Sequence, residues 1–168
     1  MTYTPPKLLG FERFIAGRIY VEILRSHCNY LIPKTCWIKP PAAEATALRP
    51  DVIVLDKDKL EQEPLWQKEP IICNGKTIKL VAEVVSSNWQ DDYARKVEEY
   101  AFLEIPEYWI VDFRGLGGLQ FIGNPKQPTF TVCQFIDGTY NQQQYRLGDR
   151  INSYLFPNLE IKLDDVIP

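Results

Sequence analysis

Two acidic residues stand at apolar segments that are expected to be strands, and their side chains could hold a metal ion. Asp51 follows Pro50 at the entrance of the apolar run 52–55, and Glu83 lies inside the apolar run 80–85. An ionised carboxylate in such a run is costly unless a partner pairs with it. Two acids from neighbouring strands could bind a hard cation such as Mg²⁺, which prefers oxygen ligands. Such a cation polarises a phosphoryl oxygen and activates a bound water, so phosphodiester hydrolysis becomes feasible.

A lysine beside these acids would stabilise developing negative charge or hold the attacking water. Lys79 shares the strand and the face of Glu83, but four residues at about 3.3 Å each place it roughly 13 Å away. Lys96 belongs to the helical pattern that follows, on the shoulder of its buried stripe at about 100° per residue. A helix that crosses back over the sheet can bring this shoulder to the end of the strand. Lys96 is therefore the better candidate.

Each candidate also has a purely structural interpretation. Asp51 could cap the entrance of its strand, and Glu83 could belong to an internal pair. Lys96 has the i, i+4 spacing from Asp92 that is typical of an ion pair within one helix. Two acids and a lysine are therefore weak evidence of catalysis by themselves.

The elements that position these residues are predicted from residues 80–113. This stretch divides into an apolar run, a polar break, a helical pattern and a second apolar run. The order predicts a parallel β-α-β unit whose strands are buried on both faces. Ser87 and Gln90 match a capping box, and Pro106 ends the helix. The predicted buried stripe of the helix consists of Tyr93, Val97, Tyr100 and Ala101.

Apolar spacing and turn residues predict the remaining elements. A helix is expected over 10–31, and Pro33 should end it. The GLGG residues 115–118 are interpreted as a hairpin turn rather than a phosphate loop, because no Lys-Ser/Thr pair follows. Asp137–Gly138 is a second hairpin signal. Strands are expected over 36–38, 49–56, 119–123 and 129–136, a long surface loop over 57–76, and a docking tail over 152–167.

Composition and charge define the class of protein. A length of 168 residues with 45% hydrophobic and 24% charged residues fits one soluble domain, 1–168, with 1–10 as an extended arm. The net charge of −3 provides no general attraction to nucleic acid, so a local patch or bound cations would have to supply it. The cysteines form no CxxC pair and His27 lacks metal-ligand spacing, which favours free thiols. No run is long enough to span a membrane, so a cytoplasmic protein is expected.

Four segments form a recognisable pattern: Pro50-Asp51-Val52, Glu83-Val84-Val85-Ser86, the spaced residues Asp92, Lys96 and Tyr100, and 106–112. Together they resemble the Uma-two family of restriction-endonuclease-like proteins, in the PD-(D/E)XK nuclease superfamily. The resemblance implies an α/β fold in which helices flank a restriction-endonuclease-like mixed β-sheet, with C-terminal β-hairpin additions. It further implies a Mg²⁺ or Mn²⁺ site at Asp51 and Glu83, with Lys96 as electrostatic partner and DNA as substrate. A homodimer is left open.

The chain departs from the family pattern at two places. The superfamily lysine belongs two residues after the glutamate, where this chain has Val85, so Lys96 is the expected substitute. The Tyr-Glu-x-x-x-Gly segment that relatives carry before the first helix is expected to be lacking, and Glu12 or Glu22 could stand in for its acid. The leading hypothesis is a Mg²⁺-dependent endonuclease. The alternatives are a catalytically impaired relative that binds nucleic acid or protein, and a structural subunit whose acids are internally paired.

Overall fold

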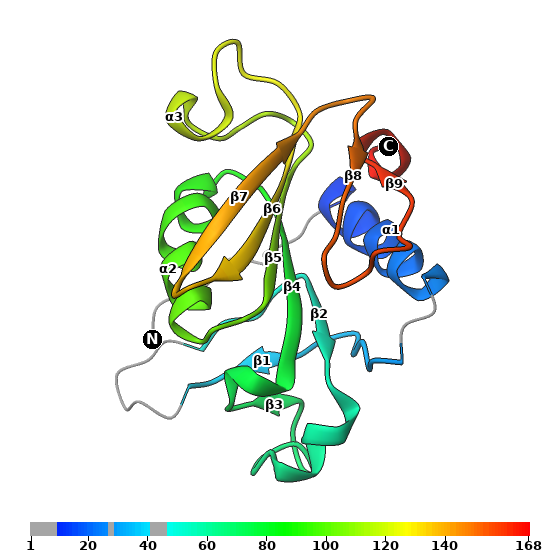
Figure 1. Ribbon diagram of the computed structural model, residues 1–168, viewed down its shortest axis with the longest axis vertical. Coiled ribbons are helices and arrows are strands. Elements are labelled where there is room, and N and C mark those ends of the chain that lie inside the picture. The colour runs from blue at the N-terminus through cyan, green and yellow to red at the C-terminus, as the bar shows by residue number, and fades with distance from the viewer. Residues whose placement is uncertain (1–9, 27–28, 41–46) are drawn as a thin grey trace.

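A five-stranded mixed sheet forms the centre of the structure (Figure 1). The computed structural model describes residues 10–26, 29–40 and 47–168. In the strand order β2-β4-β5-β6-β7, β4 and β5 are parallel and every other neighbouring pair is antiparallel. The predicted mixed sheet is confirmed. Its strands are β2 (Val52–Leu55), β4 (Ile78–Val84), β5 (Glu107–Asp112), β6 (Thr129–Ile136) and β7 (Thr139–Tyr145).

Different helices cover the two faces of this sheet, as Figure 1 shows. The side chains of α1 (Phe11–Arg25) and α4 (Leu163–Val166) pack on one face, and those of α2 (Lys96–Phe102) pack on the other. Successive side chains of a strand point to opposite faces, so each strand contributes to both cores. The α1 face includes Val54, Ala82, Trp109 and Val111. The α2 face includes Ile53, Val81, Tyr108 and Ile110.

The predicted parallel unit is formed by β4, the helical segment and β5. Every residue of β5 is buried, as expected for a central strand covered on both faces. The helical segment begins with a π turn, Asp91–Arg95, before the regular helix α2. The predicted capping box at Ser87 and Gln90 is wrong, because no side chain caps the turn at Gln90. The backbone supplies the first bond instead, from the Asp91 N–H to the Asn88 carbonyl at 3.0 Å.

The first helix is shorter than predicted. It ends at Arg25, where the Ser26 hydroxyl donates to the Ile23 carbonyl at 2.6 Å, so Pro33 does not terminate it. Leu31 instead forms a bridge with Leu55 at the edge of β2. His27 and Cys28, which were expected to lie in this helix, fall outside the described residues.

The segment predicted as a long loop over 57–76 contains ordered elements. A buried carboxylate organises it: Glu63 accepts hydrogen bonds from the Cys73 N–H at 2.7 Å, the Asn74 N–H at 3.1 Å and the Thr77 hydroxyl at 2.6 Å. Apolar periodicity could not reveal this arrangement, since one side chain binding local backbone holds it. The elements are two 3₁₀ turns, Lys57–Gln62 and Gly75–Thr77, and β3 (Ile71–Ile72), which pairs with β1 (Trp37–Ile38).

The predicted strand over 119–123 is wrong, because Leu119–Ile122 is a short helix, α3. The GLGG residues before it form a connection held by Asp112 rather than a hairpin turn. The Asp112 carboxylate accepts from the backbone N–H groups of Leu116 and Gly117, each at 2.8 Å. A Cβ atom at Gly117 would lie 2.7 Å from the Tyr93 ring, so only glycine permits this close approach.

The C-terminal half follows the prediction more closely. β6 and β7 form the hairpin expected at Asp137–Gly138, whose φ angles of 51° and 86° are those of a tight hairpin turn. The tail docks on the α1 face through α4 and the short pair β8 (Arg150–Ile151) and β9 (Ile161–Lys162). In the described parts of the chain, no helix is long and apolar enough to cross a membrane.

Candidate active site

Asp51 and Glu83 lie at the same end of the antiparallel ladder between β2 and β4. The last register pair joins the residue after Asp51 to the residue before Glu83. Because side chains alternate along a strand, Asp51 falls on the side of Ile53, and Glu83 on the side of Val81. Both of these apolar residues belong to the core beneath α2. The two acids therefore share the face that α2 covers.

The Asp51 carboxylate replaces a backbone partner at the end of the ladder. Its Oδ2 atom accepts from the Val84 N–H at 2.7 Å, and the Asp51 N–H donates to the Ala82 carbonyl at 3.1 Å. Asp51 thus has the structural role of a strand cap. A carboxylate offers about four lone-pair positions, and the bond to Val84 uses one of them.

Lys96 connects the helix to Glu83. Its Nζ atom lies 3.3 Å from Glu83 Oε1 and donates to Asp92 Oδ1 at 2.7 Å. The exposed fractions of the three side chains are 10% for Lys96, 0% for Glu83 and 4% for Asp92. A cation and two carboxylates are therefore removed from water together, in an arrangement that compensates their charges. The predicted i, i+4 pair within the helix and the predicted approach of Lys96 to the strand both occur.

A π turn sets the direction of these helical side chains. The Lys96 N–H bonds to the carbonyl of Asp91, five residues earlier, rather than four as in an α-helix. Asp92, Lys96 and Tyr100 follow at intervals of four residues, and all three are buried against the sheet. π turns inside α-helices are frequent at functional sites.

Two buried tyrosines complete the cluster. The Tyr100 hydroxyl donates to Glu83 Oε1 at 2.6 Å, and the Tyr108 hydroxyl donates to the Asp92 carbonyl at 2.7 Å. Burial, and next the negative charge of Asp51, raise the pKa of Tyr100 well above its usual range. Burial and the charge of Asp92 raise the pKa of Tyr108 in the same way. Tyr100 therefore keeps its proton, with which it binds Glu83, and the charge of Asp51 contributes to holding that proton.

The other acids and the other lysine considered from the sequence are engaged elsewhere. Lys79 Nζ lies 3.7 Å from Asp56, at the far end of β2. Glu12 accepts from Arg114 at 2.9 Å, and Glu22 pairs with Arg25 on the surface of α1.

The donor set of this cluster fits a divalent cation of the Mg²⁺ kind. Among the residues that the structure describes, no group of three or more His, Cys, Asp or Glu side chains could hold a metal ion. Mg²⁺ needs only one or two protein carboxylates, because waters and substrate phosphates fill its remaining positions. Asp51 and Glu83 are two carboxylates on one face of the sheet, and their oxygen atoms are of the kind that such an ion prefers.

The sequence places Asp92 and Tyr100 in the family motif with Lys96 but predicts no contact of either with Glu83: Asp92 is interpreted as the helical partner of Lys96, and Tyr100 as core. Their spacing of four residues on either side of Lys96 is the signal for a shared site, because it places all three on one side of the helix. The hydroxyl of a buried tyrosine also needs a polar partner, and Glu83 is a buried acid predicted to need one as well.

Comparison with known proteins agrees with the fold and identifies the family. No curated protein matches the chain at a significant level. The family model Uma2, described as "Putative restriction endonuclease", matches residues 7–164, which include β2, β4, the π turn and α2. A mixed sheet flanked by helices, with antiparallel strands at its C-terminal side, is consistent with a restriction-endonuclease-like fold. The chain therefore belongs to the Uma2 family.

Proposed function

We propose that this chain is a divalent-metal-dependent endonuclease that hydrolyses phosphodiester bonds in DNA. One observation carries the proposal. The Nζ atom of Lys96 lies 3.3 Å from Glu83, so α2 supplies the cation that the superfamily motif places on the strand two residues after the glutamate. The family match supports a nuclease-like activity.

Each residue of the cluster has a distinct part in the proposal. Asp51 and Glu83 would hold Mg²⁺ or Mn²⁺, which supplies a polarised phosphoryl oxygen and an activated water. Lys96 places positive charge beside the position where negative charge develops during hydrolysis. Asp92 holds the lysine amine by a 2.7 Å bond, and the protonated Tyr100 fixes the orientation of Glu83 by a 2.6 Å bond. Asp92 and Tyr100 are therefore positioning residues.

Location in the cytoplasm is part of the same proposal and rests on the thiols. Cys36 and Cys133 are free and buried, and Cys73 is free and partly exposed. Burial raises the pKa of Cys36 to about 12 and the pKa of Cys133 to about 12, so both remain protonated and unreactive. A reducing compartment suits a chain with such thiols.

A second candidate function is a nuclease-fold module that binds nucleic acid or protein without cutting. The observation that favours it concerns Glu83, whose side chain is fully buried, already forms an ion pair with Lys96 and accepts a hydrogen bond from Tyr100. A metal ion would have to share this carboxylate with both.

A plasmid nicking assay tests the proposal. Wild-type protein should convert supercoiled DNA to open circles with Mg²⁺ or Mn²⁺ but not with chelator. Asp51→Asn and Glu83→Gln should abolish nicking, because each removes a ligand charge while keeping the side-chain volume. Asp56→Asn, at the other end of β2, is the matched control and should nick normally.

The outcomes separate the two candidate functions. Nicking that survives Asp51→Asn unchanged would show that the activity comes from another site or another protein. A folded wild type that binds DNA and never cuts it would establish the binding module. An RNA substrate in the same assay decides whether DNA is the preferred polymer.

A further inference from the structure

A pocket of about 600 Å³ lies between α1 and the start of β2, next to the candidate active site. Asp51 is among the residues that line it, so the pocket and the acid cluster share that residue. The pocket is of the size that takes a small molecule or one unit of a polymer. The other lining residues used below are Arg13, Tyr20, Ile32, Lys34 and Arg49.

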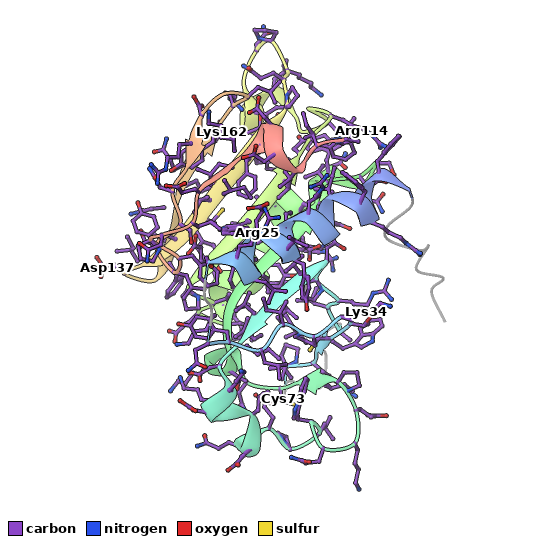
Figure 2. The ribbon with its side chains drawn as sticks, turned by 90° about the vertical axis from the view of Figure 1, so that its right-hand side faces the viewer. Arg25, Lys34, Cys73, Arg114, Asp137 and Lys162 are labelled. Atoms are coloured by element: carbon purple, nitrogen blue, oxygen red, sulfur yellow. The ribbon has the colours of Figure 1, made fainter. Side chains whose placement is uncertain are left out.

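One side of the pocket is positively charged. Arg13 comes from α1, Lys34 from the segment that runs below that helix in Figure 2, and Arg49 from the residues just before β2. With Asp51 the charged lining sums to three positive and one negative charge, or +2, whereas the whole chain carries −3. The Arg49 guanidinium lies 5.5 Å from the centre of the Trp37 ring, which limits its range of orientations.

The other side of the pocket is apolar and has room for a ring. Ala16, Gly17 and Tyr20 lie on one face of α1 and line the pocket. A Cβ atom at Gly17 would meet nothing within 4 Å, so the space beside the helix is open there. Tyr20 is 37% exposed, and with Ile32 it offers a surface on which a sugar or an unpaired base can pack.

We propose that this pocket binds one nucleotide of the polynucleotide strand, beside the bond that is cut. The phosphate of that nucleotide contacts Arg13, Lys34 and Arg49, and its sugar or base packs against Tyr20 and Ile32. The pocket supplies the local positive charge that an acidic chain needs to attract nucleic acid. The inference rests on the proposed endonuclease function, because the shared residue Asp51 connects the pocket to the cutting site.

Binding of a fluorescein-labelled single-stranded oligonucleotide, followed by anisotropy with Ca²⁺ in place of Mg²⁺, tests the pocket directly. Lys34→Gln and Arg49→Gln should each weaken binding several-fold. Each should also reduce the slope of log K against log salt by up to about 0.7, the value for one phosphate contact on a single strand. Gly17→Leu should weaken binding without changing the slope, because it fills the apolar side and removes no charge.

The control variants are Arg25→Gln and Arg150→Gln, which remove exposed cations outside the pocket and should leave affinity and slope unchanged. Equal losses in pocket and control variants would overturn the proposal in favour of general electrostatic attraction. Unchanged binding in Lys34→Gln, Arg49→Gln and Gly17→Leu would also overturn it. Gly17→Leu should keep or raise the melting temperature, since leucine favours a helix more than glycine, so lost binding is not lost folding.

Two further measurements complete the test. Binding of inorganic phosphate or a mononucleotide as tight as that of the oligonucleotide would overturn a polymer site in favour of a small-molecule site. Glu83→Gln lies outside the pocket and should fail to cut, while Lys34→Gln and Arg49→Gln should weaken oligonucleotide binding in this background as they do in the wild type. Pocket-dependent binding without any cutting by the wild type would mean that the endonuclease function fails and the pocket stands. Cutting without pocket-dependent binding would mean that the endonuclease function stands and the pocket proposal fails.

Discussion

Two buried glutamates on neighbouring strands differ in their partners, which are charged for one glutamate and neutral for the other. Glu83 on β4 faces α2 and meets the ammonium group of Lys96 at 3.3 Å. Glu107 on β5 faces α1 and accepts only from neutral donors: the Trp109 indole at 2.8 Å, the Ser153 hydroxyl at 3.1 Å and the Leu155 N–H at 2.9 Å. Through these neutral donors, Glu107 holds the C-terminal tail against the sheet.

The difference indicates how a structural acid is distinguished from a functional one. Glu107 lies in the middle of a packed face, where its bonds tie residues 153–155 to the sheet. Glu83 lies next to the end of a ladder, beside a second acid, and its charge is balanced by a side chain from another element. Burial alone does not separate the two. The two glutamates are distinguished by the charge of their partner and by the presence of a second acid beside Glu83.

The largest effect on stability is expected from Glu107→Ala. The substitution leaves three buried donors without an acceptor, and each such donor costs about 1–3 kcal/mol. We expect the free energy of unfolding to fall by about 4 kcal/mol in urea denaturation. Glu107→Gln, which keeps one acceptor oxygen, should lose less. Nicking activity per folded molecule should not change, and its loss in a stable variant would make Glu107 part of the site.

Lys96→Met should reduce nicking by about a hundredfold, a typical result of removing one group that stabilises charge in a transition state. It should also lower stability, because Glu83 and Asp92 stay buried without their cation. Adding Glu83→Gln should restore part of that stability, since one uncompensated charge disappears. If the double variant is less stable than Lys96→Met alone, the cluster is not held by charge balance.

Metal binding should separate the two glutamates directly. Mg²⁺ or Mn²⁺ should stabilise the wild type by about 1.4 kcal/mol at a free concentration ten times Kd, measured as a rise in melting temperature. The rise should persist in Glu107→Gln and vanish in Glu83→Gln. A rise of equal size in both variants would place the metal away from Asp51 and Glu83.

The smallest expected effect is a dependence of stability on pH through Glu107. Burial raises the pKa of this carboxyl from the usual 4.5, and its hydrogen bonds oppose the shift only in part. The folded state therefore binds the proton more tightly than the unfolded state, so stability from this group is present at low pH and is lost as pH rises through the folded pKa. Glu107→Gln should flatten the stability profile just above pH 4.5 by about 1 kcal/mol or less. An unchanged profile would show that the carboxyl titrates normally.

Sequence reasoning found the parts of the fold that depend on apolar runs and turn residues. The runs around Glu83 and before Phe113 correctly predicted β4 and β5, and Asp137–Gly138 correctly predicted the β6–β7 hairpin. Such patterns carry their own periodicity, so a single chain displays them. The homodimer, and the functional roles of Asp51, Glu83 and Lys96, stay predictions.

The remaining parts depend on contacts that have no period. Glu63 orders residues 63–77 by binding local backbone, and Asp112 holds the connection to α3 in the same manner. A four-residue helix such as α3 is too short to show a stripe, so its apolar residues resemble a strand. The pocket beside Asp51 joins segments that are remote in the sequence, and only the packing of α1 against β2 brings their cations together.

The π turn at Asp91–Arg95 makes the site unusually sensitive to chain length. The turn holds one residue more than an α-helical turn, and Ala94 within it is exposed and makes no contribution to the core. Deleting Ala94 would remove no side chain from the core, yet it would convert the π turn to an α-helical turn and change the spacing of Asp92 and Lys96 from i, i+4 to i, i+3. Loss of nicking on this deletion, with Ala94→Ser fully active, would identify the turn as a spacer. Relatives with the same chemistry are then expected to vary in residue type at this position and not in residue number.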